Sequence, residues 1–199
     1  MTKTVVRCAW AGSDELNVQY HDQEWGVPEY GENRLFEMIT LEGAQAGLSW
    51  LTILRKRDGY RKAFASFDPR RVAGFDEQTV ETLVLDASIV RHRGKIESTI
   101  SNARTILALW DQGLSLKELV WDVVEGKPKV NQWRSLSEIP GATSESGQLS
   151  KRLKKLGFRF VGPTTCYAFM QAAGLVNDHE TRCFRYQQCQ NQECQNTAI

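Results

Sequence analysis

The sequence lacks the features that would place the protein in several specialised classes. No apolar run approaches the ~20 residues that a membrane-spanning helix requires, so we expect no contact with membranes. The N-terminal segment has no apolar stretch like that of a signal peptide, which favours a cytoplasmic protein. Cysteines number five, and in a reducing compartment we expect no disulfide bonds among them. With a formal net charge of +1, the chain also lacks the positive excess typical of nucleic-acid-binding proteins.

Strand patterns are missing as well. No stretch alternates apolar and polar residues with period two over several positions, and we therefore predict an all-α fold. The length of 199 residues and the hydrophobic fraction of 41% are sufficient for one compact domain with a real core. We predict a single helical domain over residues 1–186 and expect it to be a monomer. Residues 187–199, dominated by Gln, Asn and Cys, have too little apolar content to fold alone and are expected to form a flexible tail.

Helical spacing of apolar residues runs through most of the chain after residue 30, whereas residues 1–30 are expected to be irregular. Predicted helices cover residues 34–43, 49–67, 76–87, 96–110, 116–123, 149–156 and 163–174. Residues 126–148 form a longer polar connection. No internal repeat is present.

The stretch 35–50 carries the first chemical signal. On a helix, Leu35, Met38, Ile39 and Ala46 share one narrow apolar stripe, and Glu42 falls in the middle of it. Burying an uncompensated charge costs several kcal/mol, so this carboxylate must be paired, protonated or used. The structural alternative is a glutamate that pairs with a buried arginine or caps a neighbouring helix, and both interpretations stay open at this point.

Glu37, on the same predicted helix, points the other way and is expected to be solvated. Gly43 and Gly47 are expected to end the helix, and Ser49 is a suitable N-cap for the next one. The inward Glu42 would then lie beside a glycine-flanked loop that carries Gln45, Leu48 and Trp50.

Aromatic residues gather in the first third of the chain. Core packing is the ordinary role of Trp10, Tyr20, Trp25 and Trp50. Because all four occur near an inward glutamate, they instead favour a flat-walled pocket for a planar ligand.

A pair of predicted helices over residues 149–174, with Phe160-Val-Gly162-Pro163 at its turn, resembles a helix-hairpin-helix. Gly162 lets the backbone approach a phosphate closely, and the next helix offers free N–H groups to the anion. Lys154 and Lys155, within the basic run of the preceding helix, could add phosphate contacts. The alternative is an ordinary helical hairpin with a solvated basic face.

Cysteine and histidine spacing indicates a metal site. His179 and Cys183 are four residues apart, and Cys8 and His21 form a second pair near the N-terminus. Two thiolates and two imidazoles would make a closed tetrahedral zinc site with no position for a substrate, which points to one structural ion. A rival local site would use His179, Cys183, Cys189 and Cys194. Spacing alone leaves both sites open.

Taken together, these motifs resemble the family of 3-methyladenine DNA glycosylases I, bacterial enzymes of alkylation repair. The resemblance is carried by Cys8-Ala-Trp10, Tyr20-His-Asp-Gln-Glu-Trp-Gly-Val-Pro28, Leu35-Phe-Glu-Met-Ile-Thr-Leu-Glu-Gly43, Gln45-Ala-Gly-Leu-Ser-Trp50, Arg91-His-Arg-Gly-Lys95, Phe160-Val-Gly162 and Leu175-Val-Asn-Asp-His179. It spans nearly the whole chain and implies a helix-hairpin-helix glycosylase-like fold whose terminal segments are joined by a zinc site.

The resemblance also implies roles for particular residues. Its zinc ligands are Cys8, His21, His179 and Cys183, in preference to the rival local site. Glu42, Tyr20 and Trp50 match the base-pocket residues of the family, and Trp10 and Trp25 are carried over as pocket-lining candidates. The sequence departs from the family pattern in the C-terminal tail and at residue 17, where asparagine stands in place of a tyrosine near the pocket.

The activity that the resemblance implies is removal of 3-methyladenine from alkylated double-stranded DNA by base flipping, which leaves an abasic site. Glu42 would accept hydrogen bonds from the base and favour its positive charge. Trp50 would stack on the ring, Tyr20 would bind the base edge, and Gln45 or Leu48 would wedge into the vacated base stack.

The pocket motifs contain no lysine, which argues against Schiff-base lyase chemistry. As general base, Asp178 is the least implausible candidate, although a role in orienting the adjacent His179 is favoured. The alternative function is a non-catalytic, zinc-stapled module that recognises damaged DNA, which would have no use for a carboxylate in an aromatic pocket.

Overall fold

The computed structural model describes residues 5–191 of the chain. Its helices are α1 (Glu15–Gln23), α2 (Glu32–Gln45), α3 (Trp50–Ala63), α4 (Pro69–Ala73), α5 (Glu77–Leu85), α6 (Arg93–Asp111), α7 (Leu116–Trp121), α8 (Ser144–Leu156), α9 (Pro163–Ala172) and α10 (Phe184–Gln190). Short 3-10 turns cover Ala9–Ala11, Ala65–Phe67, Asp122–Val124 and Leu136–Glu138. The predicted all-α class is confirmed, and no helix within residues 5–191 combines the length and the apolar character needed to cross a membrane.

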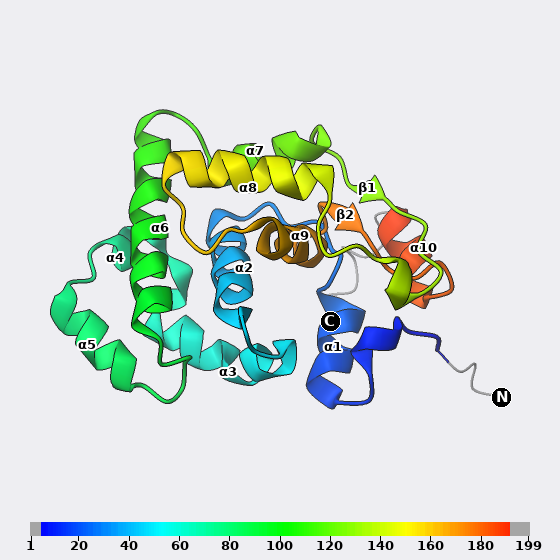
Figure 1. Cartoon of the computed structure of the whole chain (residues 1–199), viewed down its shortest axis with the longest axis horizontal. Helices are drawn as coiled ribbons and strands as arrows, with labels where there is room; N and C mark the ends of the chain where they lie inside the picture. Colours follow the sequence, from blue (N-terminus) through cyan, green and yellow to red (C-terminus); the bar gives the residue numbers. More distant parts are fainter. Residues whose placement is uncertain (1–4, 192–199) are drawn as a thin grey trace.

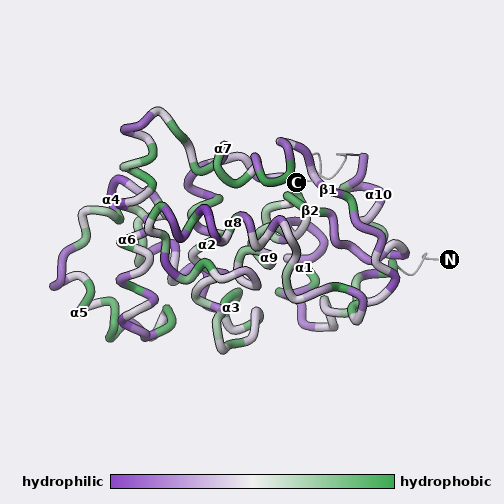
Figure 2. Tube along the Cα trace, turned by 45° about the horizontal axis from the view of Figure 1, so that its top comes forward, coloured by the Kyte–Doolittle hydropathy of each residue, from purple (hydrophilic) through white to green (hydrophobic). Residues whose placement is uncertain are grey.

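Helix α2 lies at the centre of the molecule, where it packs against α3, α6, α7 and α9 (Figure 1). The core around it includes the fully buried rings of Phe36, Phe64, Phe67 and Phe169. Hydrophobic and hydrophilic positions alternate along most of the trace, as expected for helices that are buried on one side (Figure 2). Helices α8 and α9 pack on each other, and α9 also packs on α2.

One small pair of strands departs from the helical pattern. β1 (Lys129–Val130) pairs in parallel with β2 (Val176–Asn177), and the pairing is extended by a hydrogen bond of 3.1 Å from Asn131 N–H to the Asn177 carbonyl. Two residues are too few for period-two alternation to show in the sequence. The pairing holds the connection after α7 against the C-terminal segment of the chain.

The predicted helix over residues 49–67 is wrong only in its last four residues, 64–67. Helix α3 ends at Ala63, and Ala65, Ser66 and Phe67 adopt positive φ angles of 50°, 55° and 56°. This turn buries both Phe64 and Phe67, and the gain from packing two aromatic rings outweighs the continuation of the helix. Helix α4 then begins after Asp68, whose side chain accepts a hydrogen bond from the Arg70 N–H.

Residues 1–30 were expected to be irregular, but they include α1. Asp14 caps this helix by accepting a hydrogen bond from the Leu16 N–H, and only Tyr20 and His21 within it are buried. Because two buried positions make no apolar stripe, the sequence pattern could not reveal the helix. Helix α8 likewise begins earlier than predicted, at Ser144, where Thr143 and Ser146 form a capping box.

The predicted tail begins too early at residue 187. Helix α10 continues through Gln190, and Cys189 is only 4% exposed. Burial of Tyr186 and Cys189 gives this polar helix the packing that its composition did not indicate. Residues 192–199, including Cys194, lie outside the described part of the chain.

Candidate active site and metal centre

Helix α2 carries two buried glutamates in opposite electrostatic environments. Glu42 is 6% exposed, as predicted from its place on the apolar stripe. Within residues 5–191 it forms no hydrogen bond or ion pair, so the alternative in which it pairs with a buried arginine does not hold. Burial raises the pKa of Glu42 to about 8. Helix α2 thus presents a buried carboxyl group that no side chain within residues 5–191 pairs with.

Glu37 was expected to be solvated, and this prediction is wrong. Glu37 is 4% exposed and lies 2.8 Å from both Arg34 and Arg57 and 3.0 Å from Arg61. Burial acts to raise its pKa, but the nearby guanidinium groups overcome this effect and hold the pKa below its ordinary value. Because α2 is covered by neighbouring helices on several sides, a position opposite the apolar stripe is also buried.

A cavity of about 350 Å³ opens beside Glu42. Its walls are Trp10, Tyr20, Trp25, Glu42, Gln45, Trp50, Leu136, Ile139, Pro140, Gly141, Thr164, Tyr167, Ala168 and Gln171. The structure therefore brings the four predicted aromatic residues, the predicted carboxylate and Gln45 together in one pocket. Its volume lies within the range typical of small-molecule sites, and the four aromatic residues form part of its lining.

The aromatic walls are in mutual contact. The ring centres of Trp10 and Trp25 are 4.9 Å apart, and those of Tyr20 and Trp50 are 5.1 Å apart. Among the described residues, the buried indole N–H groups of Trp10 and Trp50 have no hydrogen-bond acceptor. Burial and the nearby Glu42 raise the pKa of Tyr20 well above its ordinary value, so its phenol keeps its proton. These donors and the Glu42 carboxyl are available to a planar polar ligand.

Two walls of the cavity were not predicted from the sequence. On α9, Thr164, Tyr167, Ala168 and Gln171 are spaced as one helical face, and this spacing was a signal that could have found them. The segment 136–141 consists of the short 3-10 turn Leu136–Glu138 and the three residues after it, which is too short for a periodicity, so no sequence pattern could have placed it at the pocket. Asn17 is not among the lining residues.

The loop after α2 differs in one respect from its prediction. Gly43 does not end the helix, which continues to Gln45, and a Cβ atom at Gly43 would lie 3.2 Å from that of Phe160 in the α8–α9 turn. Glycine there permits close packing of this turn on α2. Gly47 has a φ of +80°, Leu48 is 41% exposed, and Ser49 caps α3 as predicted.

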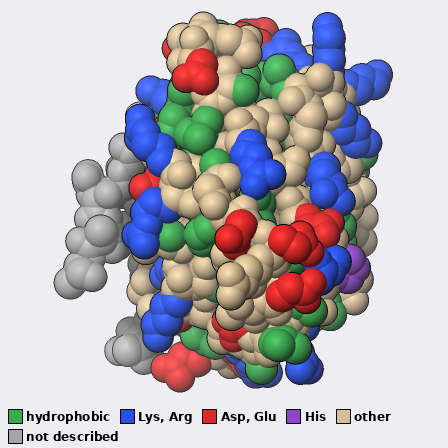
Figure 3. Space-filling view, turned by 90° about the vertical axis from the view of Figure 1, so that its left-hand side faces the viewer, with side chains coloured by type: hydrophobic (Ala, Val, Ile, Leu, Met, Phe, Trp, Pro, Cys, Tyr) green, Lys and Arg blue, Asp and Glu red, His purple; other side chains and the backbone are tan. Residues whose placement is uncertain are grey.

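Two cationic side chains of the basic run at residues 91–95 form contacts within the protein. The buried Lys95 donates hydrogen bonds of 2.8 Å to the carbonyls of Ala44 and Ala46, which fixes the loop after α2. Arg93 forms ion pairs with Glu77 and Glu81. The face over α4, α5 and α6 accordingly mixes cationic and anionic side chains (Figure 3).

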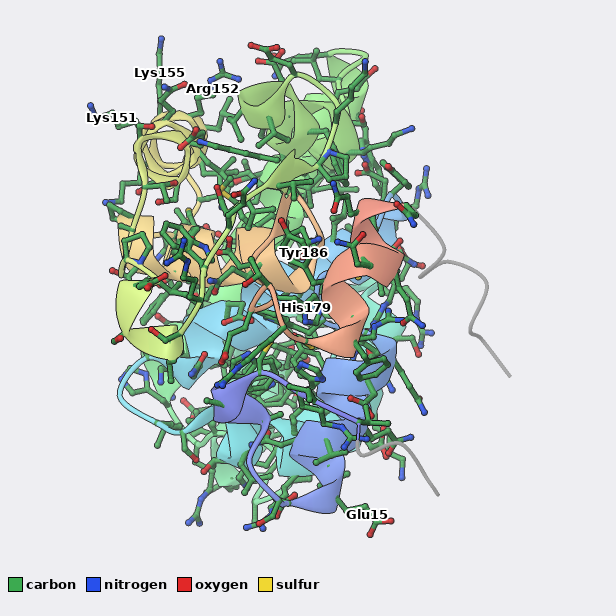
Figure 4. The ribbon with its side chains drawn as sticks, turned by 90° about the vertical axis from the view of Figure 1, so that its right-hand side faces the viewer. Glu15, Lys151, Arg152, Lys155, His179 and Tyr186 are labelled. Atoms are coloured by element: carbon green, nitrogen blue, oxygen red, sulfur yellow. The ribbon has the colours of Figure 1, made fainter. Side chains whose placement is uncertain are left out.

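The basic run on α8 is more available. Lys154 and Lys155 are exposed, and Lys151, Arg152 and Lys155 point outward from the helix (Figure 4). Gly162 precedes α9 as its N-cap, and a Cβ atom there would meet no atom within 4 Å. Space is therefore open beside Gly162 at the start of α9, as the close approach of an anion requires.

The four predicted metal ligands meet at one end of the molecule, where both terminal segments lie together. The donor atoms of Cys8, His21, His179 and Cys183 all lie within 4.8 Å of one another, and all four residues are buried. The Cys8 Sγ is 3.5 Å from His179 Nδ1, and the Cys183 Sγ is 3.5 Å from His21 Nε2. Cys189 is not part of this cluster.

The surroundings of the cluster fit a metal ion. His21 Nδ1 is 2.7 Å from Asp22 Oδ1, and His179 Nε2 is 3.0 Å from the carbonyl of Trp25, so that each imidazole turns its other nitrogen inward. Hydrogen bonding from Cys8 and the two histidines lowers the pKa of Cys183, which favours a thiolate. Two sulfurs and two imidazole nitrogens are the donor set of a closed tetrahedral zinc site.

Asp178 does not orient His179, contrary to the favoured prediction. The carboxylate instead accepts four hydrogen bonds, which come from Asn131 (2.7 Å), Trp133 (2.8 Å), Tyr167 (2.5 Å) and Gln171 (2.8 Å). With two donors on each oxygen, no lone pair remains for a water molecule. Asp178 is therefore not suited to act as a general base.

Comparisons with known proteins agree with this arrangement. A model of the methyladenine glycosylase family matches residues 10–186. The chain is 56% identical over 180 residues to DNA-3-methyladenine glycosylase 1 of Escherichia coli (strain K12), a match that covers 90% of this chain and 96% of that protein.

Solved structures give the same result. The fold matches a crystal structure of 3-methyladenine DNA glycosylase I with a TM-score of 0.89 and 55% identity, covering 90% of this chain and 98% of the other. A variant of 3-methyladenine DNA glycosylase I in complex with 3-methyladenine matches with a TM-score of 0.86 and 38% identity, covering 89% and 96%. This chain belongs to the methyladenine glycosylase family.

Proposed function

We propose that the protein is a DNA repair N-glycosylase that flips 3-methyladenine out of alkylated DNA and hydrolyses its N-glycosidic bond, leaving an abasic site. The observation that carries this proposal is Glu42, a buried carboxyl group that has no hydrogen-bond or ion-pair partner among the described residues and lies in a cavity with aromatic walls. Methylation at N3 leaves the adenine cationic. Such a base has a positive charge that can pair with Glu42 and a flat ring that can stack on the aromatic walls.

The proposed reaction depends more on recognising the damaged base than on activating its glycosidic bond. The positive charge already weakens the bond to the sugar, which breaks with its electron pair moving to the base. Water adds to the sugar carbon and releases its proton to solvent. Flipping costs a few kcal/mol and less for a damaged base, so the pocket needs to hold the extruded base in place while the bond breaks.

Each predicted pocket residue has a role in this proposal. Glu42 accepts hydrogen bonds from the base N–H groups and stabilises the cation. Trp50 stacks on the ring, where cation–π attraction contributes about 2 kcal/mol in a desolvated site. Tyr20 donates to the base edge from its protonated phenol, and Trp10 and Trp25 complete the aromatic wall.

Binding of the cation also changes the protonation of Glu42. In the free protein, burial raises its pKa to about 8. A positive ring beside the carboxylate attracts it more strongly than in bulk solvent and lowers that pKa, so that Glu42 loses its proton as the base enters. Normal adenine carries no charge and offers no such gain, which gives the pocket its selectivity.

The proposed DNA surface lies around the pocket mouth. Lys154 and Lys155 would contact phosphates of the double-stranded substrate, and Gly162 would present the first N–H groups of α9 in the manner of a helix-hairpin-helix. The exposed Leu48, or Gln45 at the pocket edge, would fill the gap that the flipped base leaves.

The metal cluster has a structural role in this proposal. A zinc ion held by Cys8, His21, His179 and Cys183 would join the two terminal segments and leave no position for a substrate. We propose that the glycosylase is a single domain, in line with the family match over residues 10–186, and that it works as a cytoplasmic monomer.

Incubating the protein with methylated duplex DNA and identifying the released bases by chromatography tests the proposed function. We expect release of 3-methyladenine without strand cleavage, because hydrolysis leaves the sugar–phosphate backbone intact. Binding of methylated DNA without any released base would indicate that the protein is a damage-binding module and not an enzyme.

A further inference from the structure

The carboxylate of Asp178 connects two walls of the cavity. It is 1% exposed. Its Oδ1 accepts from Asn131 and Trp133, which precede the wall 136–141. Its Oδ2 accepts from Tyr167 and Gln171, which line the cavity from α9. One side chain thus holds two separate parts of the pocket lining.

The wall 136–141 has few other attachments next to this carboxylate. Main-chain hydrogen bonds join Asn131 to Asn177 at 3.1 Å and Thr181 to the carbonyl of Trp133 at 2.8 Å. Both lie before the wall begins. Within the wall, Glu138 accepts a hydrogen bond of 2.8 Å from the Arg134 N–H, and Ile139 packs against the core. The side-chain hydrogen bonds of Asn131 and Trp133 to Asp178 help to fix the direction in which the segment enters the pocket.

Asp178 also sets the hydrogen-bond polarity of the α9 wall. A carboxylate only accepts hydrogen bonds, so Tyr167 must turn its O–H toward Asp178 and Gln171 must offer its amide nitrogen. The phenolic oxygen of Tyr167 and the amide oxygen of Gln171 are then left as acceptors. Acceptors suit a cationic base that carries N–H donors.

We infer that Asp178 is a positioning residue of the base pocket, which holds the wall 136–141 against α9 and orients Tyr167 and Gln171 as acceptors. This inference rests on the proposed function and assigns Asp178 no contact with the base. Its saturated carboxylate acts through the residues that line the cavity.

The substitution Asp178→Asn tests this inference. The asparagine keeps the size of the side chain but replaces an acceptor oxygen by an N–H donor, so that donors face donors at one end. We expect the dissociation constant for free 3-methyladenine, measured by calorimetry, to rise about tenfold or more, because the wall 136–141 and the acceptors on α9 would no longer be held in the geometry that binds the base.

Glu32→Gln is the matched control. Glu32 is also a carboxylate that accepts several hydrogen bonds, from Trp110 and from the N–H groups of Leu116 and Lys117, but it lies at the other end of α2 from Glu42. This variant is expected to lower thermal stability and to keep the wild-type affinity for 3-methyladenine. An equal loss of affinity in both variants would reduce Asp178 to a general stabilising role and overturn the inference.

Trp133→Phe provides a second, milder test that does not depend on the folding of the Asp178 variant. It keeps the aromatic ring and removes one donor to Asp178. Hydrogen exchange should become faster in residues 131–141 and stay unchanged in α7, with a smaller loss of 3-methyladenine affinity. Wild-type exchange and affinity in this variant would contradict the inference.

The proposed function and the role of Asp178 can be refuted independently of each other. If the wild-type protein releases no 3-methyladenine from methylated DNA, the proposed function is wrong whatever the variants do. If the wild-type protein releases it and Asp178→Asn binds free 3-methyladenine as tightly as wild type, with the same zinc content, only the role of Asp178 is wrong.

Discussion

Replacing Glu42 by glutamine should stabilise the free protein, and more so as the pH rises. Burial raises the pKa of Glu42 from 4.5 to about 8. The folded state therefore holds a proton that the unfolded state has released between these two values, and wild-type stability falls as the pH rises through this window. Glutamine does not titrate, so Glu42→Gln removes the penalty.

The size of this effect follows from the same values. At about 1.4 kcal/mol per pH unit, the penalty that Glu42 imposes reaches at most about 5 kcal/mol above pH 8 and vanishes below pH 4.5. Relaxation of the pocket and water entry reduce this upper limit. We expect the free energy of unfolding of Glu42→Gln to exceed that of wild type by a few kcal/mol at pH 9 and to differ little at pH 4.5.

Denaturant unfolding followed by circular dichroism at pH 4.5, 7 and 9 measures this difference. Other groups titrate alike in both proteins and cancel. Glu37→Gln is the control on the same helix and should have the opposite sign, because it leaves Arg34, Arg57 and Arg61 without a buried carboxylate. Stability curves of Glu42→Gln and wild type that run parallel over the whole pH range would refute the reasoning.

Three further predictions concern the metal, the DNA and the ring of the base. Removing zinc with a chelator should lower the melting temperature, and Cys8→Ser should lose the metal whereas Cys189→Ser should retain it; the reverse pattern in metal analysis would support the local site. Affinity for undamaged duplex should fall steeply with salt, and Lys154→Glu or Lys155→Glu should weaken it irrespective of sequence; insensitivity of the measured affinity to both changes would place the DNA surface elsewhere. Trp50→Ala should weaken binding of free 3-methyladenine by roughly tenfold or more, with little change in affinity for undamaged duplex, and unchanged calorimetric affinity would exclude stacking on this ring.

The sequence was sufficient to predict the centre of the pocket. Glu42 interrupts an apolar stripe, and a helical period is enough to turn such a residue inward. The grouping of the four Cys and His side chains could also be predicted, because few residue types bind zinc and the resemblance to the family selected Cys8 over the cysteines of the tail. In both cases the chemical type of the residue was informative only together with a pattern, the helical period for Glu42 and the family motif for Cys8.

The parts that could not be predicted depend on contacts between distant segments. Glu37 is buried because Arg57 and Arg61 reach it from α3, and the pattern of α2 alone contains no sign of them. The wall 136–141 has no period, and hydrogen bonds to Asp178 hold the residues that precede it. Helix α1 escaped prediction since it buries only Tyr20 and His21 within a polar sequence.

Single-turnover excision by Glu42→Gln tests the central claim most directly. The claim is that a buried carboxylate in an aromatic pocket selects a cationic base, and glutamine keeps the shape of that carboxylate without its charge. We expect excision of 3-methyladenine from methylated duplex to slow by about a hundredfold, the loss typical of removing one electrostatic contact in an active site. Circular dichroism and affinity for undamaged duplex should match wild type, and undiminished excision by this variant would contradict the account.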